Sequence, residues 1–214
     1  MKQMLILTGP QGAGNHFWSK IFSMHADVYG WRTLLENYWE AHRFSEPFAK
    51  HWKNPSLLDE FNWDRSEYYF TSMSVPLGIY NYKENPIWVP NLKMFADLVE
   101  ANGVNVQFAV IGRERNILEH QQKRIRGDIT YHMFMEQLED IPDPVYLSYE
   151  LLHLYKRNYL KSIKQQVNIP VSWNDPRLDN ILSDDPNQKY IHNVETSELD
   201  QGNRMGTTFK QKPK

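Results

Sequence analysis

The pattern of apolar and polar positions predicts a protein built from alternating strands and helices. Residues 5–7 form a continuous apolar run that ends at Thr8, Gly9 and Pro10, which is typical of a strand buried on both faces of a parallel sheet. Three later segments are rich in β-branched and aromatic residues or follow prolines. We expect these segments to be strands as well: residues 68–75, 104–112 and 145–149.

Apolar residues at helical spacing lie between these strands. Phe17, Ile21 and Met24 recur at intervals of four and three residues and predict a helix that starts near Asn15. Asn91 is the expected N-terminal cap of a second helix. Helices after the first are expected in three places: residues 91–101, residues 130–138 and the stretch that begins at residue 150.

The alternation of elements predicts an α/β fold of three layers with a mostly parallel central sheet and a binding site at the carboxyl ends of its strands. A chain of 214 residues can bury one sizeable core, so we expect a single domain over residues 1–200 and a basic tail over residues 201–214. Aromatic residues are dense between residues 27 and 66. Most of these rings are expected to pack in the core around short helices, and a few to line an acceptor pocket.

Composition narrows the expected partners. The formal net charge is −2 and charges of both signs are interspersed, so we expect a small anionic ligand at a local basic site and no nucleic acid. The absence of cysteine excludes a disulfide framework, a thiolate metal site and a cysteine nucleophile. No apolar run reaches membrane-spanning length and the first strand begins almost at once, so we expect a cytoplasmic protein that binds no membrane.

Glycines follow the first strand at the spacing of a nucleotide-binding P-loop. Gly9, Gly12 and Gly14 let the backbone curl tightly, so that successive N–H groups and the start of the next helix favour an anion. The two positions that normally carry Lys and Ser or Thr are Asn15 and His16. The sequence therefore predicts a phosphate-binding loop that lacks two parts of the machinery for ATP chemistry.

These two replacements change the expected reaction. Phosphoryl transfer from a nucleoside triphosphate uses the loop Lys and a hydroxyl-held magnesium ion to neutralise charge on the transferring group. No Asp ends the strands at residues 68–75 and 104–112, where a magnesium-dependent triphosphatase carries one. A sulfuryl group carries less negative charge and is transferred without a metal. The loop therefore suits a sulfate donor better than ATP, and we expect no metal.

With these residues the chain resembles the P-loop sulfotransferases, especially small sulfotransferase-like proteins of phages. The resemblance implies transfer of a sulfuryl group from 3′-phosphoadenosine 5′-phosphosulfate (PAPS) to a hydroxyl or amine of a small-molecule or carbohydrate acceptor, which leaves 3′-phosphoadenosine 5′-phosphate (PAP). A later segment, Tyr149-Glu150-Leu151-Leu152, is similar to the Tyr-Glu-x-Leu segment that ends a strand in this family. The resemblance implies that six loop residues bind the 5′-phosphosulfate: Gln11, Gly12, Ala13, Gly14, Asn15 and His16.

Two further segments resemble the parts of this family that bind the 3′-phosphate of the donor. Arg113 directly follows the strand at residues 104–112, and Gln121 stands eight residues later, where the family carries Ser. The resemblance implies that both bind the 3′-phosphate, and guanidinium suits such bidentate capture. Near the C-terminus, Arg204-Met205-Gly206 with Lys210 resembles an Arg-x-Gly…Lys element that closes over the same phosphate, which implies that the tail orders when donor binds. The region after Arg113 is also basic, with Arg115, Lys123, Arg124 and Arg126.

The reaction also needs a base, because an acceptor hydroxyl becomes a good nucleophile only as its proton leaves. Residues 44–48, Phe-Ser-Glu-Pro-Phe, resemble the Lys-Glu-x-x-Phe-Phe segment of carbohydrate sulfotransferases, which implies that Glu46 is this base. His42, Glu36 and His16 are further candidates. His16, at the start of a helix, is also placed to donate a hydrogen bond to the transferring or bridging oxygen.

Two other functions stay open at this point. A small-molecule or nucleotide kinase with a degenerate P-loop would bind ATP with magnesium, which the missing Lys and hydroxyl disfavour. A catalytically silent nucleotide-binding protein would bind the donor without turnover. A doubly wound sheet hosts many functions, so the fold alone does not decide among the three.

Overall fold

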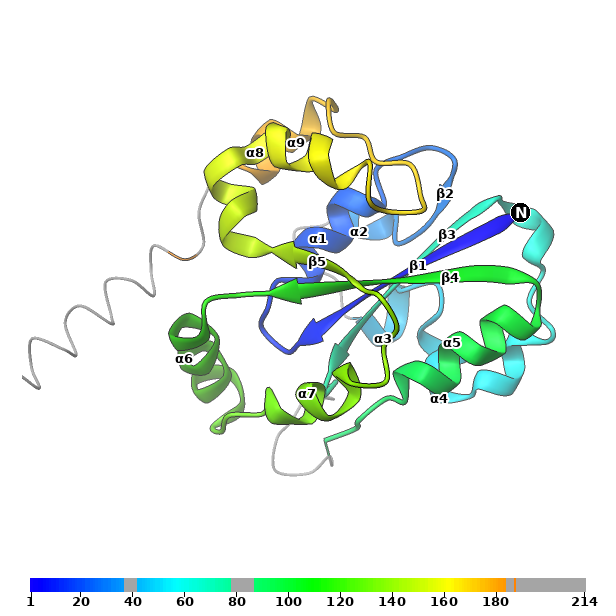
Figure 1. The fold of residues 1–214 in the computed structure, drawn as a ribbon, viewed down its shortest axis with the longest axis horizontal. Coiled ribbons are helices and arrows are strands. Elements are labelled where there is room, and N and C mark those ends of the chain that lie inside the picture. The colour runs from blue at the N-terminus through cyan, green and yellow to red at the C-terminus, as the bar shows by residue number, and fades with distance from the viewer. Residues whose placement is uncertain (37–41, 78–86, 184–186, 188–214) are drawn as a thin grey trace, which may run out of the picture.

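A parallel β-sheet with helices on both faces forms the centre of the computed structural model, which describes residues 1–36, 42–77, 87–183 and 187 (Figure 1). In this part of the chain the sheet has five strands in the order β2-β3-β1-β4-β5, and every neighbouring pair is parallel. The predicted α/β fold with a parallel central sheet is confirmed. The strands are β1 (Lys2–Pro10), β2 (Val28–Tyr29), β3 (Tyr68–Val75), β4 (Val104–Gly112) and β5 (Val145–Ser148).

Strand β1 lies at the centre of the sheet, between β3 and β4. Its four residues from Met4 to Leu7 are fully buried, as the apolar run predicts for a strand covered on both faces. The strand runs on through Thr8 and Pro10, however, because the chain keeps its register with β3 as far as the Pro10–Val75 pair. Gly9 lets β4 come close there, since a Cβ at this position would lie 3.1 Å from the carbonyl oxygen of Ile111.

Helices cover the two faces of the sheet in separate groups (Figure 1). One face packs against α1, α8 and α9, which contribute Trp18, Leu152 and Leu178 to its core. The other packs against α4, α5 and α7, and α6 lies at the end to which the strands point. The helices are α1 (Asn15–Phe22), α2 (Thr33–Glu36), α3 (His42–Ser45), α4 (Ala49–Lys53), α5 (Leu92–Ala101), α6 (Arg115–Arg126), α7 (His132–Leu138), α8 (Tyr149–Ile163) and α9 (Arg177–Ile181), with 3₁₀ turns at Pro55–Leu58 and Trp63–Arg65.

The cap of α5 agrees with the prediction, whereas the end of β5 and the presence of β2 differ from it. Helix α5 begins after Asn91, whose side chain accepts a hydrogen bond from the Met94 N–H at 2.8 Å, so the predicted cap is confirmed. Tyr149 was expected to end the last strand and instead begins α8, because Ser148 caps that helix by accepting the Leu151 N–H. The two-residue strand β2 was not predicted, since two residues are too few for an alternating pattern.

The described aromatic residues between positions 27 and 66 pack mainly in the core, as expected, whereas Tyr38, Trp39 and the Phe44 side chain lie outside the described part of the structure. Phe48 lies against Tyr29, Phe61 and Trp63 with ring centroids 5.1–6.0 Å apart. Trp52 stacks on Phe95 of α5 at 3.6 Å. These rings hold α4 and the residue Phe48 before it in the core on the face of the sheet that α5 covers.

Candidate functional site

The glycine-rich loop joins β1 to α1 at the carboxyl end of the central strand (Figure 1). Gly12 and Gly14 have backbone φ angles of +90° and +111°, which residues with a side chain rarely adopt. A Cβ at Gly14 would also lie 2.6 Å from the ring of Tyr149. The loop therefore requires glycine at both positions and packs tightly against the start of α8.

Hydrogen bonds hold the loop from both sides. The Gln11 N–H donates to the carbonyl of Val75 on β3, and the Gln11 carbonyl accepts from Gln122 Nε2 of α6 at 2.8 Å. The Gly12 carbonyl accepts from the Arg113 guanidinium. Within the described residues, the N–H groups of Gly12, Gly14 and Asn15 have no protein acceptor. Such a set of backbone donors at the start of a helix favours an anion.

Asn15 occupies the position at which ATP-binding P-loops carry lysine. Its side chain is 7 % exposed, and Nδ2 donates to the hydroxyl oxygen of Ser74 at 2.7 Å. The other end of the amide, Oδ1, has no hydrogen-bond partner among the described residues. A neutral amide adds no positive charge to the loop, so its affinity for anions rests on backbone dipoles and on α1.

Arg113 lies where the sequence predicts it, directly after β4, and the structure brings it together with Gln121 and the loop. Its guanidinium donates to the Gly12 carbonyl, to Gln121 Oε1 and to Asn187 Oδ1, and lies 4.7 Å from the ring centre of Tyr149. These bonds use three of the five N–H groups of the guanidinium, so a 3′-phosphate at Arg113 would share it with these protein acceptors or replace one of them.

The other basic residues expected near Arg113 contribute less. Arg115 forms an exposed ion pair with Glu119, with Nε and Oε1 2.7 Å apart. Lys123 and Arg124 lie on the exposed side of α6. Arg204 and the rest of the 201–214 tail lie outside the described residues, so their proposed part in donor binding stays a prediction.

Glu46 lies beside the edge of β3 that faces away from β1, and its carboxylate is fully buried. Oε1 accepts from the Thr71 hydroxyl at 2.7 Å and Oε2 from the Phe48 N–H at 2.8 Å, and the Ser72 N–H also donates to this carboxyl. Burial raises the pKa of Glu46 to about 8, because these hydrogen bonds only partly offset the loss of water. Glu46 is therefore mostly protonated at neutral pH.

His42 lies beside Glu46, one helical turn earlier, with Nε2 4.0 Å from Glu46 Oε2. This Nε2–H donates to the carbonyl oxygen of Ser72. Burial lowers the pKa of His42 to about 4, so the ring is neutral at pH 7 and Nδ1 carries a lone pair. That Nδ1 is buried and has no hydrogen-bond partner among the described residues.

The short length of β2 explains why these two side chains meet at Ser72. Strand β2 pairs with β3 only at Tyr68 and Tyr69, so β2 does not pair with β3 at Ser72. The Glu46 carboxyl accepts the Ser72 N–H, and His42 donates to the Ser72 carbonyl. The two side chains therefore complete the hydrogen bonding that a neighbouring strand would otherwise provide. Their spacing of four residues allows both to reach the backbone of the same residue.

The structure brings the three candidate catalytic residues into one cluster. The His16 ring lies 5.0 Å from Trp31, and Trp31 lies 5.5 Å from the ring of His42. The indole N–H of the buried Trp31 donates to Ser45, which holds α3 in place. Glu36, the remaining candidate base, is exposed at the end of α2.

Sequence reasoning missed three residues of this region: Trp31, Gln122 and Asn187. Gln122 is 1 % exposed and follows the buried Leu118 by one helical turn, so a polar residue on the apolar side of α6 was the available signal. Asn187 is 4 % exposed and bridges Arg113 and Glu150. Its contact spans 74 residues of sequence and gives no local signal.

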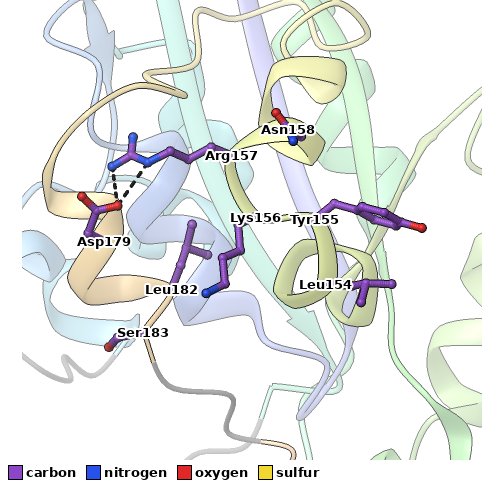
Figure 2. A pocket seen from close by; sticks show the side chains of 8 residues that line it. All are labelled: Leu154, Tyr155, Lys156, Arg157, Asn158, Asp179, Leu182 and Ser183. Carbon is purple, nitrogen blue, oxygen red and sulfur yellow. Dashed lines mark hydrogen bonds and ion pairs between the residues drawn. The ribbon is translucent and has the colours of Figure 1, made fainter.

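A cavity of about 490 Å³ lies elsewhere, between α8 and α9 (Figure 2). Arg157 and Asp179 form an ion pair on its wall, and Lys156 beside them has a φ of +48° that kinks α8. None of the predicted site residues that the structure describes lines this cavity, whose walls are Leu154, Tyr155, Lys156, Arg157, Asn158, Asp179, Leu182 and Ser183.

Comparison with protein-family models and with curated proteins finds no match to this chain. Among the helices that the structure describes, none has both the length and the apolar character needed to cross a membrane. The residues that the structure describes, in helices and elsewhere, contain no group of three or more His, Asp or Glu side chains that could hold a metal ion. The glycine-rich loop and its surroundings therefore give the main indication of function.

Proposed function

We propose that this protein is a sulfotransferase that uses PAPS as donor and a hydroxyl or amine as acceptor. The observation that carries the proposal is the loop: the N–H groups of Gly12, Gly14 and Asn15 have no acceptor among the described residues, and neither a lysine nor a magnesium-binding hydroxyl accompanies them. This donor set fits a phosphosulfate, whose transferring group needs less charge neutralisation than a terminal phosphate.

The neighbouring residues supply the other contacts. Arg113 and Gln121 would hold the 3′-phosphate of the donor. The phosphate would then replace Asn187 Oδ1 as an acceptor of the Arg113 guanidinium. His16, in the first turn of α1, would donate a hydrogen bond to the transferring sulfuryl group or the bridging oxygen. When bound, PAPS supplies the sulfuryl group, which passes to the acceptor oxygen or nitrogen as the bond to phosphate breaks.

The acceptor must lose a proton as this bond forms, and two side chains are suited to take it. Glu46 is the first candidate, and its raised pKa of about 8 means that it works as a base only in the fraction of molecules that have lost their proton. His42 is the second, because its Nε2–H is held by Ser72 and Nδ1 is unprotonated at neutral pH. The pH dependence of turnover distinguishes them, since only the Glu46 mechanism gives a rate that rises up to about pH 8.

The proposed reaction is placed in the cytoplasm, in keeping with a sequence that has no cysteine. Transfer is tested by incubating the protein with ³⁵S-labelled PAPS and panels of hydroxyl and amine acceptors, and by measuring labelled product together with PAP. Acceptor-dependent formation of both supports the proposal. Tight PAP binding without transfer to any acceptor identifies a silent binding protein, and transfer of phosphate from ATP with magnesium identifies a kinase.

A further inference from the structure

Helix α6 contacts the donor loop through a buried glutamine that the proposed reaction has not yet used. Gln122 is 1 % exposed, and its side chain makes three hydrogen bonds. Nε2 donates to the Gln11 carbonyl at 2.8 Å, and Oε1 accepts the N–H groups of Thr130 and Tyr131 at 2.8 and 3.1 Å. The side chain therefore ties the loop to the segment between α6 and α7.

The bond to Gln11 fixes more than one atom. The carbonyl of Gln11 and the N–H of Gly12 belong to the same peptide group, which is planar and trans, so they point in opposite directions. While Gln122 holds the carbonyl toward α6, the Gly12 N–H must point away from α6. This N–H is one of the three in the loop without a protein acceptor in the described part of the chain.

Glycine at position 12 makes this restraint necessary. With a φ of +90° and no side chain, the residue can rotate its flanking peptides more freely than any other residue. The Gln11 N–H is held by Val75, and the next peptide is held by Arg113 at the Gly12 carbonyl and by the Ala13 N–H, which donates to Pro10. Gln122 holds the remaining peptide, between these two fixed points.

We propose that Gln122 is a positioning residue that keeps the Gly12 N–H directed at the 5′-phosphosulfate. This inference rests on the proposed function. It assigns Gln122 to preorganisation of the loop rather than to contact with the donor, because its polar atoms are already taken by Gln11, Thr130 and Tyr131.

The variant Gln122→Glu tests this role. An ionised carboxylate still accepts the N–H groups of Thr130 and Tyr131 and has no hydrogen to donate to Gln11, but it also places a negative charge beside the anion-binding loop. Gln137→Glu is the matched control, because Gln137 of α7 also accepts a backbone N–H, from Leu92, and makes no hydrogen bond to the loop in the described part of the chain. Thermal unfolding of both variants shows whether the fold is retained. The variant Gln122→Met is of similar size, cannot donate to Gln11 and adds no charge, so a loss of PAP affinity shared by Q122M and Q122E reports the missing hydrogen bond rather than the added charge.

The readouts are PAP affinity by calorimetry and the amide spectrum of protein labelled with ¹⁵N-glycine. We expect Q122E to bind PAP about tenfold more weakly, since a hydrogen bond to a charged group is lost, and Q137E to bind as the wild type does. PAP should shift the Gly12 and Gly14 amide signals in the wild type and only the Gly14 signal in Q122E. Unchanged affinity, or equal shifts in both proteins, overturns the proposal.

A further probe separates this inference from the function on which it rests. Inorganic pyrophosphate is titrated in parallel with PAP. If the wild type binds pyrophosphate but not PAP, the sulfotransferase proposal fails, and the Gly12 signal with pyrophosphate still decides the role of Gln122. If it binds neither anion, both proposals fail.

Discussion

The buried carboxyl of Glu46 should make the folding stability of the whole protein depend on pH. Its pKa is about 8 in the folded protein and 4.5 when the carboxyl is in water. Between these values the unfolded chain has lost the proton and the folded chain keeps it, so folding takes up a proton and becomes less favourable as pH rises. Below pH 4.5 both states are protonated and the penalty disappears.

The size of the effect follows from the two pKa values. One pH unit corresponds to 1.36 kcal/mol, so the penalty reaches about 5 kcal/mol above pH 8 and changes by roughly 3 to 4 kcal/mol between pH 5 and pH 8. Domains of this size are stable by about 5–15 kcal/mol, so this is a large share of the total. The low pKa of His42 destabilises the fold on the acid side instead, where the unfolded ring gains a proton and the folded ring does not.

The variant Glu46→Gln isolates the carboxyl, because the amide keeps the size of the protonated side chain and cannot ionise. Urea unfolding followed by tryptophan fluorescence gives the free energy of unfolding at each pH. We expect the variant to be about as stable as the wild type near pH 5 and more stable by roughly 3 to 4 kcal/mol at pH 8. The contribution of His42 is present in both proteins and cancels in this difference.

Glu60→Gln serves as the control, because Glu60 is exposed and its replacement should give no pH-dependent difference. Curves for the wild type and E46Q that stay parallel from pH 5 to pH 8 would refute the reasoning, since Glu46 would then be ionised in the native state. In that case, transfer that depends on Glu46 would also show no rise toward pH 8.

Three further predictions concern the surroundings of the loop and of Glu46. Asn187→Ala should raise PAP affinity about threefold to tenfold, because it removes an acceptor from Arg113; calorimetry checks this beside Asn180→Ala, and a lower affinity would contradict it. Gly14→Ala should destabilise the fold by more than the 1–3 kcal/mol of an unfavourable φ, since the new Cβ would also meet Tyr149; denaturation at the wild-type level would be inconsistent with the loop geometry. Thr71→Val should cost about 2–4 kcal/mol in urea unfolding, because the Glu46 carboxyl and the Trp52 N–H both lose a buried partner.

Local sequence signals correctly predicted several parts of the fold. The apolar run of β1, the cap at Asn91 and the glycine spacing of the loop each depend on neighbouring residues, and each agrees with the structure. The proximity of Arg113 and Gln121 to the loop also follows from position, because parallel strands end at one edge of the sheet.

The remaining features depend on contacts between distant parts of the chain. Glu46 and His42 can both bond to Ser72 because β2 ends before it reaches that residue. The sequence of residues 42–46 does not indicate the length of β2. Gln122 reaches Gln11 across 111 residues of sequence, and Asn187 reaches Arg113 across 74. The pKa of a buried carboxyl likewise depends on the packing around it rather than on its neighbours in the chain.

Titration calorimetry of the wild-type protein tests the central claim most directly. PAP is titrated in the presence of EDTA, and ATP is titrated with magnesium in a parallel experiment. We expect saturable binding of PAP without any metal and little or no binding of ATP, because the loop offers backbone N–H groups but no lysine or magnesium ligand. Tighter binding of ATP with magnesium than of PAP would contradict this claim.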